Sequence, residues 1–526
     1  MKTRYPIFLA LLLLVGAACV FQPLPAVAQM TSVGIDCSQI QQFHVDVQDN
    51  MRAGRAMIEC GLSPAGHPTY GFSNATTPPN IRASNRKCTS ASACTKSESM
   101  SYGSTKDGGQ TIVVNYNDEY YGNGSDYSGT SYSTDGGAHF TELNPPPFAN
   151  GHGFNVGDPI VVFNSKLNLF FAGDLVGSCG GQGTGLWTSK DGKKWTTGAC
   201  AHNGSFDDRE SMWVDNEPTS GTYGRMYISY NDYNTTCGAG GCLFVTYSDD
   251  GKTWSTPKQV GGTASLFLRN VQITGTPAGT TRYEGNNSTV FIAGMDEGGG
   301  GNQPRQNYMF KSLDGGKTWK STTLGPTFPA VGDLSCGYFY AVSPIWRHMG
   351  WGEPAVGPNG VVHYDYAGAG KGNDHGNIYY VQSTDNGKTW SKPIKLNTDK
   401  DGANKTQWMP SLTADENGKV TAAWYDRRKA KGTCGSITDP GCKYERVGRQ
   451  SADNGATWGK AITISTGVIP QPAQDDPYVQ GCYAGDYDYA TAQGGNSYIT
   501  WTDGRRKVQG TNVQDVDFAK VPAATK

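Results

Sequence analysis

The sequence predicts an all-β protein, a β-propeller in which seven blades are favoured and six are the alternative. Three observations carry this prediction. A short motif recurs six times, and a strand pattern that precedes it recurs seven times. The composition, with 71 Gly, 27 Pro and 28 Tyr in 526 residues, favours short strands joined by tight turns over helices.

The short motif predicts a hairpin turn at the end of each blade. Its copies read SLDGGKTW at 312–319, STDNGKTW at 383–390 and SADNGATW at 451–458, with looser or shorter copies at 133–140, 189–195 and 248–254. Successive serines lie 56 to 71 residues apart, the length of a four-stranded blade with its loops. In each copy the Asp carboxylate can accept turn amides, Gly supplies a positive φ and the aromatic residue packs under a neighbouring strand.

The second pattern is a pair of strands, the latter of which ends in an acidic or amide residue. It occurs at 111–118, 167–174, 225–232, 289–296, 361–365, 420–426 and 497–503. The blades expected from the two patterns span 98–148, 151–200, 207–257, 266–322, 351–395, 408–464 and 481–521. The last unit has no copy of the motif, so its fourth strand is missing. The segment after Gln29 is the available donor, unless it docks as a short helix near residues 50–60.

The motif Ser-X-Asp-X-Gly-X-Thr-Trp resembles the Asp box of BNR repeats in the sialidase-like superfamily. The resemblance covers most of the mature chain and implies that the boxes lie on the outer rim, with a structural role. Two departures stand out. True sialidases of the superfamily have six blades, and their Phe/Tyr-Arg-Ile-Pro motif, which carries the first arginine of the carboxylate-binding set, is absent here.

The first 28 residues predict an export signal. Lys2 and Arg4 precede an apolar run at 7–15, and a small-residue cleavage site at 26–28 comes before Gln29. We therefore expect a secreted protein, extracellular or periplasmic, without a transmembrane anchor. The expected divisions are a signal at 1–28, an N-terminal extension at 29–97, the propeller at 98–521 and a tail at 522–526.

Charge and cysteine content narrow the class further. Without the signal the chain carries 42 basic and 46 acidic residues, a balance that argues against nucleic acid as a partner. Of the 13 cysteines only Cys19 lies in the signal, and an even number in an oxidising compartment predicts disulfides. Close spacing predicts the pairs 37 with 60, 88 with 94, 179 with 200, 237 with 242 and 434 with 442, which leaves Cys336 and Cys482.

The residues that open each blade should line one end of the axial channel, where propellers usually bind ligands. They are Glu98, Asp158, Arg209 with Glu210, Arg269, Glu353, and Asp486 with Tyr487. The resemblance to sialidases implies Arg209, Arg269 and Arg347 as binders of a sugar carboxylate, with Glu210 beside them. It implies Tyr487 as nucleophile, Glu353 as its activator and Asp158 as acid/base.

Each of these residues also has a structural interpretation. Arg209 with Glu210 can form an ion-pair cluster, Arg269 and Glu353 can bridge blades, Asp158 can cap a turn, and Tyr487 can pack among neighbouring tyrosines. No organic cofactor and no catalytic metal are expected. The turn at 296–301 is rich in oxygen ligands that suit structural calcium, although EF-hand spacing is absent.

The sequence is consistent with two functions, one of an enzyme and one of a binding protein. The first is a sialidase-like glycoside hydrolase that acts on extracellular glycans or glycoproteins. The alternative is a non-catalytic propeller that binds a carbohydrate or protein partner, or serves as a scaffold at the cell surface.

Overall fold

The computed structural model describes residues 29–66, 80–85, 88, 90–119, 126–234, 237, 241–263, 266, 268–280, 284–402, 405–430, 434, 442–472 and 474–524. The expected export signal at 1–28 lies outside these residues. Within them, no helix is long and apolar enough to cross a membrane.

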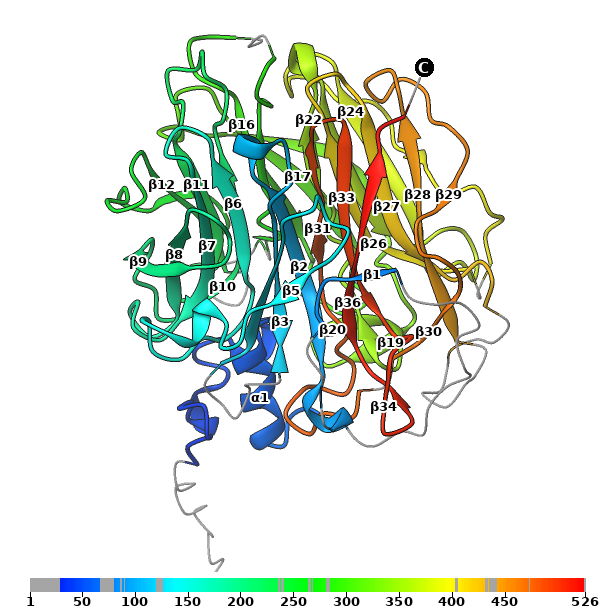
Figure 1. Ribbon diagram of the computed structural model, residues 1–526. Coiled ribbons are helices and arrows are strands. Elements are labelled where there is room, and N and C mark those ends of the chain that lie inside the picture. Colours follow the sequence, from blue (N-terminus) through cyan, green and yellow to red (C-terminus); the bar gives the residue numbers. More distant parts are fainter. Residues whose placement is uncertain are drawn as a thin grey trace, which may run out of the picture.

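The described residues form seven antiparallel sheets of four or five strands, consistent with propeller blades (Figure 1). The first three comprise β2 (Lys96–Gly103), β3 (Ile112–Asp118), β4 (Ser128–Ser133) and β5 (Thr141–Glu142); β6 (Ile160–Asn164), β7 (Leu169–Val176), β8 (Gly183–Ser189) and β9 (Trp195–Cys200); and β10 (Asp207–Val214), β11 (Met226–Asp232), β12 (Cys242–Ser248) and β13 (Lys258–Gly261).

The next three sheets repeat this order from the inner to the outer strand. They comprise β14 (Leu268–Arg269), β15 (Ile273–Gly275), β16 (Val290–Asp296), β17 (Arg305–Ser312) and β18 (Lys320–Phe328); β22 (Pro354–Val356), β23 (Val362–Gly368), β24 (Asn377–Ser383) and β25 (Ile394–Lys395); and β26 (Gln407–Ala414), β27 (Val420–Asp426), β28 (Lys443–Ser451), β29 (Ile462–Thr463) and β30 (Ile469–Pro470).

The last sheet draws strands from both ends of the chain. It comprises β32 (Thr491–Gln493), β33 (Asn496–Asp503), β36 (Asp515–Pro522) and β1 (Ile81–Arg82), in that order. β1 pairs antiparallel with β36, so the segment before the first sheet supplies the outer strand that the sequence of the last unit lacks. β31 (Asp488–Tyr489), which the sequence assigns to the last unit, instead pairs in parallel with β2 of the first sheet.

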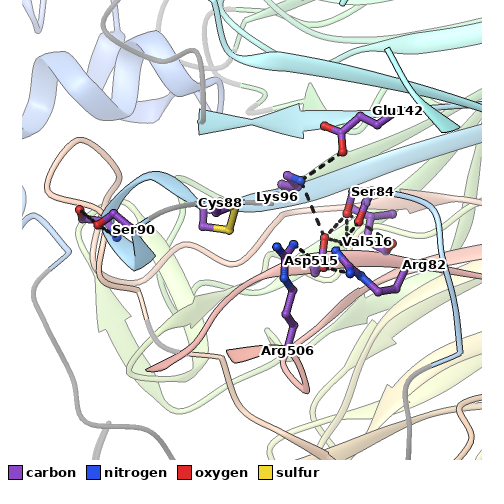
Figure 2. The surroundings of a disulfide bond; sticks show 11 residues. Arg82, Ser84, Cys88, Ser90, Lys96, Glu142, Arg506, Asp515 and Val516 are labelled. Atoms are coloured by element: carbon purple, nitrogen blue, oxygen red, sulfur yellow. Dashed lines mark hydrogen bonds and ion pairs between the residues drawn. A yellow bond between two sulfur atoms is a disulfide. The ribbon is translucent and has the colours of Figure 1, made fainter. Parts of the chain in front are cut away.

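The inner strands contact one another in a closed cycle, from β2 through β6, β10, β15, β22 and β26 to β32 and back to β2. Figure 2 shows one contact where the first and last sheets meet. The buried Lys96 Nζ lies 3.5 Å from Glu142 of its own sheet and 4.0 Å from Asp515 of the last one. Asp515 is also paired with Arg82 of β1 at 2.7 Å.

The turns after the third strands have the hydrogen bonds that the short motif requires. In the copy at 312–319, Asp314 Oδ1 accepts from the amides of Lys317 and Thr318 at 3.1 and 2.9 Å. Gly316 has a φ of 88°, which L side chains rarely adopt. The Trp319 indole donates to the Gly316 carbonyl at 3.0 Å and packs against a hydrophobic core cluster.

Smaller elements lie outside the seven sheets. They are α1 (Met51–Glu59), the 3-10 turns at 37–39, 45–47, 91–93, 105–107, 147–149 and 358–360, the three-stranded sheet of β19 (Leu334–Cys336), β20 (Phe339–Ser343) and β21 (Trp346–Arg347), and the hairpin of β34 (Lys507–Val508) and β35 (Thr511–Asn512). In Figure 1, α1, β19, β20 and β34 gather at the lower end of the molecule. A helix near residues 50–60 therefore accompanies the β1 strand, where the sequence left these as alternatives.

All six predicted disulfides are present, including the pair left over by proximity, Cys336 with Cys482. Six disulfides are typical of proteins that fold in an oxidising compartment.

Candidate functional site at the capped end of the axis

The residues that open the inner strands share an unusual backbone conformation. Glu98, Asp158, Arg209, Asn270 and Met409 all have positive φ, between 47° and 66°. In three of the sheets the pairing register shifts at this residue, between 97 and 99, 208 and 210, and 408 and 411. A bulge of this kind turns a strand residue out of its normal alternation, and it recurs from sheet to sheet at the same end of the axis.

The expected site residues are nearly all withdrawn from solvent. Arg209, Glu210, Arg269, Asp158 and Asp486 are fully buried, and Glu98, Arg347, Tyr487 and Glu353 are at most 7% exposed. Part of the cover is the N-terminal extension, whose helix α1 begins where the Met51 amide donates to the Val156 carbonyl (3.1 Å). Asn50 caps this helix, because its side chain accepts from the Ala53 amide.

Arg269 and Arg347 reach the extension. Arg269 Nη2 lies 3.0 Å from Asp49 Oδ1, and its Nη1 donates to the Val47 carbonyl. Arg347 Nη2 donates to the Asp49 carbonyl at 3.1 Å. Its Nε and Nη2 also bind Asp486 at 2.6 to 3.1 Å, and its Nη1 donates to Gln480 Oε1.

Arg209 is held differently. Its guanidinium carbon lies 3.8 Å from the centre of the Trp351 ring and 4.6 Å from that of Tyr487. Among the described residues, none of its side-chain nitrogens has a hydrogen-bond partner, and its ion pair with Asp49 Oδ2 spans 3.8 Å. Arg209 therefore carries a buried charge that ring faces and carboxylates without a direct hydrogen bond to its side chain offset, among the residues that the structure describes.

Three carboxylates meet beside the arginines, those of Asp49, Asp158 and Asp208, with one oxygen from each lying within 4.8 Å of the others. Burial and the Asp49 charge raise the pKa of Asp158 to about 7 and that of Asp208 well above its usual range. Burial also acts to raise the pKa of Asp49, but Arg269, the contact with Asp208 and Arg209 outweigh it and lower the pKa. Asp49 is therefore the ionised member of the trio.

Tyr487 and Glu353 do not form a pair. Burial, together with the charges of Asp158 and Glu98, raises the pKa of Tyr487 well above 10, and its hydroxyl has no hydrogen-bond partner among the described residues. Glu353 instead accepts from the amides of Leu412 at 3.0 Å and Ala490 at 3.1 Å, so it joins two neighbouring sheets.

Glu210 is a fully buried acidic residue of the same region. Burial and the charge of Asp158 raise its pKa well above the usual range, and neither of its carboxylate oxygens has a hydrogen-bond partner among the described residues. Its charge also acts on Tyr487.

The opposite end of the inner strands opens into a cavity of about 700 Å³. Its lining includes Trp213, Gln272, Gln493, Glu353 and Tyr489. The Tyr489 ring centre lies 4.7 Å from that of Tyr487, so this side of the cavity adjoins the arginine cluster.

Two clusters of acidic or histidine side chains in the described residues have the geometry to hold a cation. The first consists of Asp49, Asp158 and Asp208, and the second of His202, Asp207 and Asp232. In the first, Arg269 lies 3.0 Å from Asp49 and 3.3 Å from Asp208, so a guanidinium already supplies the positive charge. A third group includes Cys179 and Cys200, which are joined in a disulfide and offer no thiolate.

Sequence reasoning named three arginines that the fold brings around one point, but it assigned no role in the site to Asp49 or Asp208. Asp208 stands directly before Arg209 in the sequence, and Asp49 precedes the helix cap Asn50. Neither position carries a sequence pattern that distinguishes it from acidic residues at the protein surface.

Neither a protein-family model nor a curated protein sequence matches this chain. Among solved structures, the chain is similar to a protein of unknown function from Dyadobacter fermentans (14% identity, 86% of this chain and 100% of that chain, TM-score 0.41). It is also similar to an ulvan lyase of the PL25 polysaccharide lyases (12%, 88% and 96%, 0.42) and to a Hadza microbial sialidase (16%, 82% and 66%, 0.36). With TM-scores below 0.5 these likenesses identify no family, and the function is inferred from the site.

Proposed function

We propose that this protein is a secreted, seven-bladed, Asp-box propeller that recognises acidic glycans through a sugar carboxylate and hydrolyses a glycosidic bond beside it. In this proposal residues 1–28 are the export signal, 29–97 the extension and 98–521 the ring. The observation that carries it is the convergence of Arg209, Arg269 and Arg347 on one buried point, close to Asp158 and Tyr487.

Guanidinium groups suit this task because their planar forks bind carboxylates with two parallel hydrogen bonds. Arg209 has all its donors unused among the described residues, so it has the most capacity for a ligand. The rings of Trp351 and Tyr487 contact the guanidinium and hold it in place by cation–π interactions.

The acid/base role falls to Asp158. Its pKa of about 7 keeps the carboxyl protonated at mildly acidic pH, as protonation of a leaving-group oxygen requires. Tyr487 is the proposed nucleophile, and it needs a carboxylate to take its proton. The resemblance suggests Glu353, but Glu353 is bound to two amides, whereas neither Glu210 oxygen has a hydrogen-bond partner among the described residues. We therefore assign activation to Glu210, whose raised pKa makes it a strong proton acceptor in its ionised form.

The experiment is turnover of a fluorogenic sialoside and a panel of uronides and neutral glycosides by the mature protein. Tyr487→Phe and Asp158→Asn should each abolish turnover, and Glu210→Gln should lower it more than Glu353→Gln. Turnover that survives both of the first two substitutions would exclude this site.

The alternative is a binding propeller without catalysis. The cover provided by the N-terminal extension and the amide contacts of Glu353 favour it. Calorimetry with acidic monosaccharides distinguishes the two, since binding that depends on Arg209 without turnover of any glycoside would establish a binding module.

A further inference from the structure

We infer that the N-terminal extension is an internal ligand of the arginine cluster, with the Asp49 carboxylate in the place that a ligand carboxylate would take. The inference rests on the proposed function and adds its regulation. An external acid must displace the segment around Asp49 before it reaches Arg209 and Arg269.

The first observation is the match between Asp49 and its surroundings. Its carboxylate lies 3.0 Å from Arg269 and 3.8 Å from Arg209, two residues contributed by two different sheets. The charge of Arg347 also acts on Asp49, although this side chain is mainly bound to Asp486. All three arginines therefore contribute to keeping one carboxylate ionised in a buried position.

The second observation is that the backbone around Asp49 is held by the same groups. Asp208 accepts from the Asp49 amide at 3.0 Å, the Asn50 amide at 3.2 Å and Asn50 Nδ2 at 2.7 Å. Arg269 and Arg347 donate to the carbonyls of Val47 and Asp49. The contacts are directional and polar, as in a ligand site, and none of them comes from a neighbouring strand pairing.

The third observation is that Asp49 fills the site imperfectly. The fully buried side chain of Arg209 has no hydrogen-bond partner among the described residues, and its separation from Asp49 is too long for a close ion pair. A carboxylate on a larger group can approach Arg209 while keeping Arg269, so an external ligand has contacts to gain that Asp49 leaves unmade.

A short carboxylate probes this directly. Asp49→Ala removes a side chain that acetate resembles, so acetate should raise the Tm of this variant in a saturable manner. The wild type and Asp46→Ala should show only the small, non-saturable effect of added salt. Asp46 is a matched control because it lies on the same segment and its carboxylate accepts from Gln41 Nε2 (2.9 Å). If folded Asp49→Ala shows no saturable shift in Tm, the inference is overturned.

A second variant covers the possibility that Asp49→Ala does not fold. Asp49→Asn keeps the shape and removes the charge, so the segment should be displaced more easily. In hydrogen exchange, the amides of residues 49–51 should lose protection when N-acetylneuraminate or glucuronate is added, more in this variant than in the wild type. Unchanged protection in both would overturn the inference.

The acidic sugars also separate this inference from the proposed function. If the segment is closed in nine of ten wild-type molecules and is open in Asp49→Asn, the variant should bind them about tenfold more tightly than the wild type. If Asp49→Ala binds acetate but no acidic sugar, the internal ligand stands and the glycan proposal fails. If both proteins bind sugar with equal affinity, the glycan proposal stands and the internal ligand fails.

Discussion

The guanidinium of Arg269 lies 3.0 Å from the carboxylate of Asp49, and this contact joins the fourth sheet to the N-terminal extension. Arg269 therefore has two partners in the buried cluster, the extension and Asp208 at 3.3 Å. Its removal tests how much of the attachment of the extension depends on charge.

Arg269→Met should lower the free energy of unfolding by about 3 kcal/mol, because it leaves Asp49 buried without its closest counter-charge. The Asn50 amide should also exchange faster. Urea unfolding and hydrogen exchange measure the two effects. Arg225→Met is the control, since the Asp249 partner of Arg225 is 58% exposed and the pair should contribute less than about 1 kcal/mol. Equal losses in the two variants would contradict a role for Arg269 in holding the extension.

Asp515 should matter more than Lys96 for the junction of the first and last sheets. Asp515→Asn leaves Lys96 and two arginines without a shared counter-charge and should cost about 3 kcal/mol. Lys96→Met removes a buried charge while Asp515 keeps Arg82 and Arg506, so it should cost less than about 1.5 kcal/mol. Denaturant midpoints at constant m-value measure both, and the reverse order would show that Lys96 is the central partner.

Stability should fall as the pH rises through the range in which Asp365 ionises. Burial raises the pKa of Asp365 from 3.8 to about 8. Between these values the folded state holds a proton that the unfolded state has released, so stability is fully present below about pH 4 and is lost as the pH approaches 8.

Asp365→Asn removes this titrating group, so the free energy of unfolding should decline less steeply with pH, by up to about 1.4 kcal/mol per pH unit for one proton. The side-chain oxygen that remains can still accept from the Glu353 amide. Asp385 is a control of opposite sign: burial is the largest single effect and acts to raise its pKa, but the hydrogen bonds of the turn together outweigh it and lower the pKa to about 2. Its contribution is present above pH 4 and is lost toward pH 2. Parallel pH profiles for the wild type and Asp365→Asn would mean that Asp365 is ionised in the folded protein.

The disulfide between Cys336 and Cys482 should stabilise the fold more than that between Cys88 and Cys94. The first disulfide closes a loop of 146 residues and the second a loop of 6 residues. Chain entropy predicts that they contribute about 5 and about 2 kcal/mol to the free energy of unfolding. Paired Cys→Ser variants, compared by thermal unfolding under oxidising conditions, measure the difference. Equal effects would indicate that the unfolded chain is already constrained in the longer loop.

Much of the architecture could be predicted because it is written as a repeat. The Ser, Asp, Gly and Trp of residues 312–319 act within one turn, so local spacing is sufficient to recognise them. The disulfides could be predicted for the same reason, since five pairs are close in sequence and the sixth follows by elimination.

The site was less accessible to sequence reasoning. Blade openings identified Arg209 and Arg269, because each inner strand starts at the same end of the axis. Asp49 could not be found in this way, since its role depends on where a non-repeating segment docks. The contacts of Glu353 with Leu412 and Ala490 likewise depend on packing between sheets, which no local pattern encodes.

The pairing of β1 with β36 also constrains how the chain can be made. Residues 81 and 82 leave the ribosome early, but their partners at 517 and 518 are among the last to be synthesised. At usual elongation rates this first strand must wait roughly 20 to 90 seconds for its partner. Until then the ring cannot close. Once β36 has been made, it is an open edge until β1 pairs with it, and a second molecule can place its own first strand there. Such an exchange would link two copies through their early segments, so the order of synthesis makes crowding a hazard for this protein.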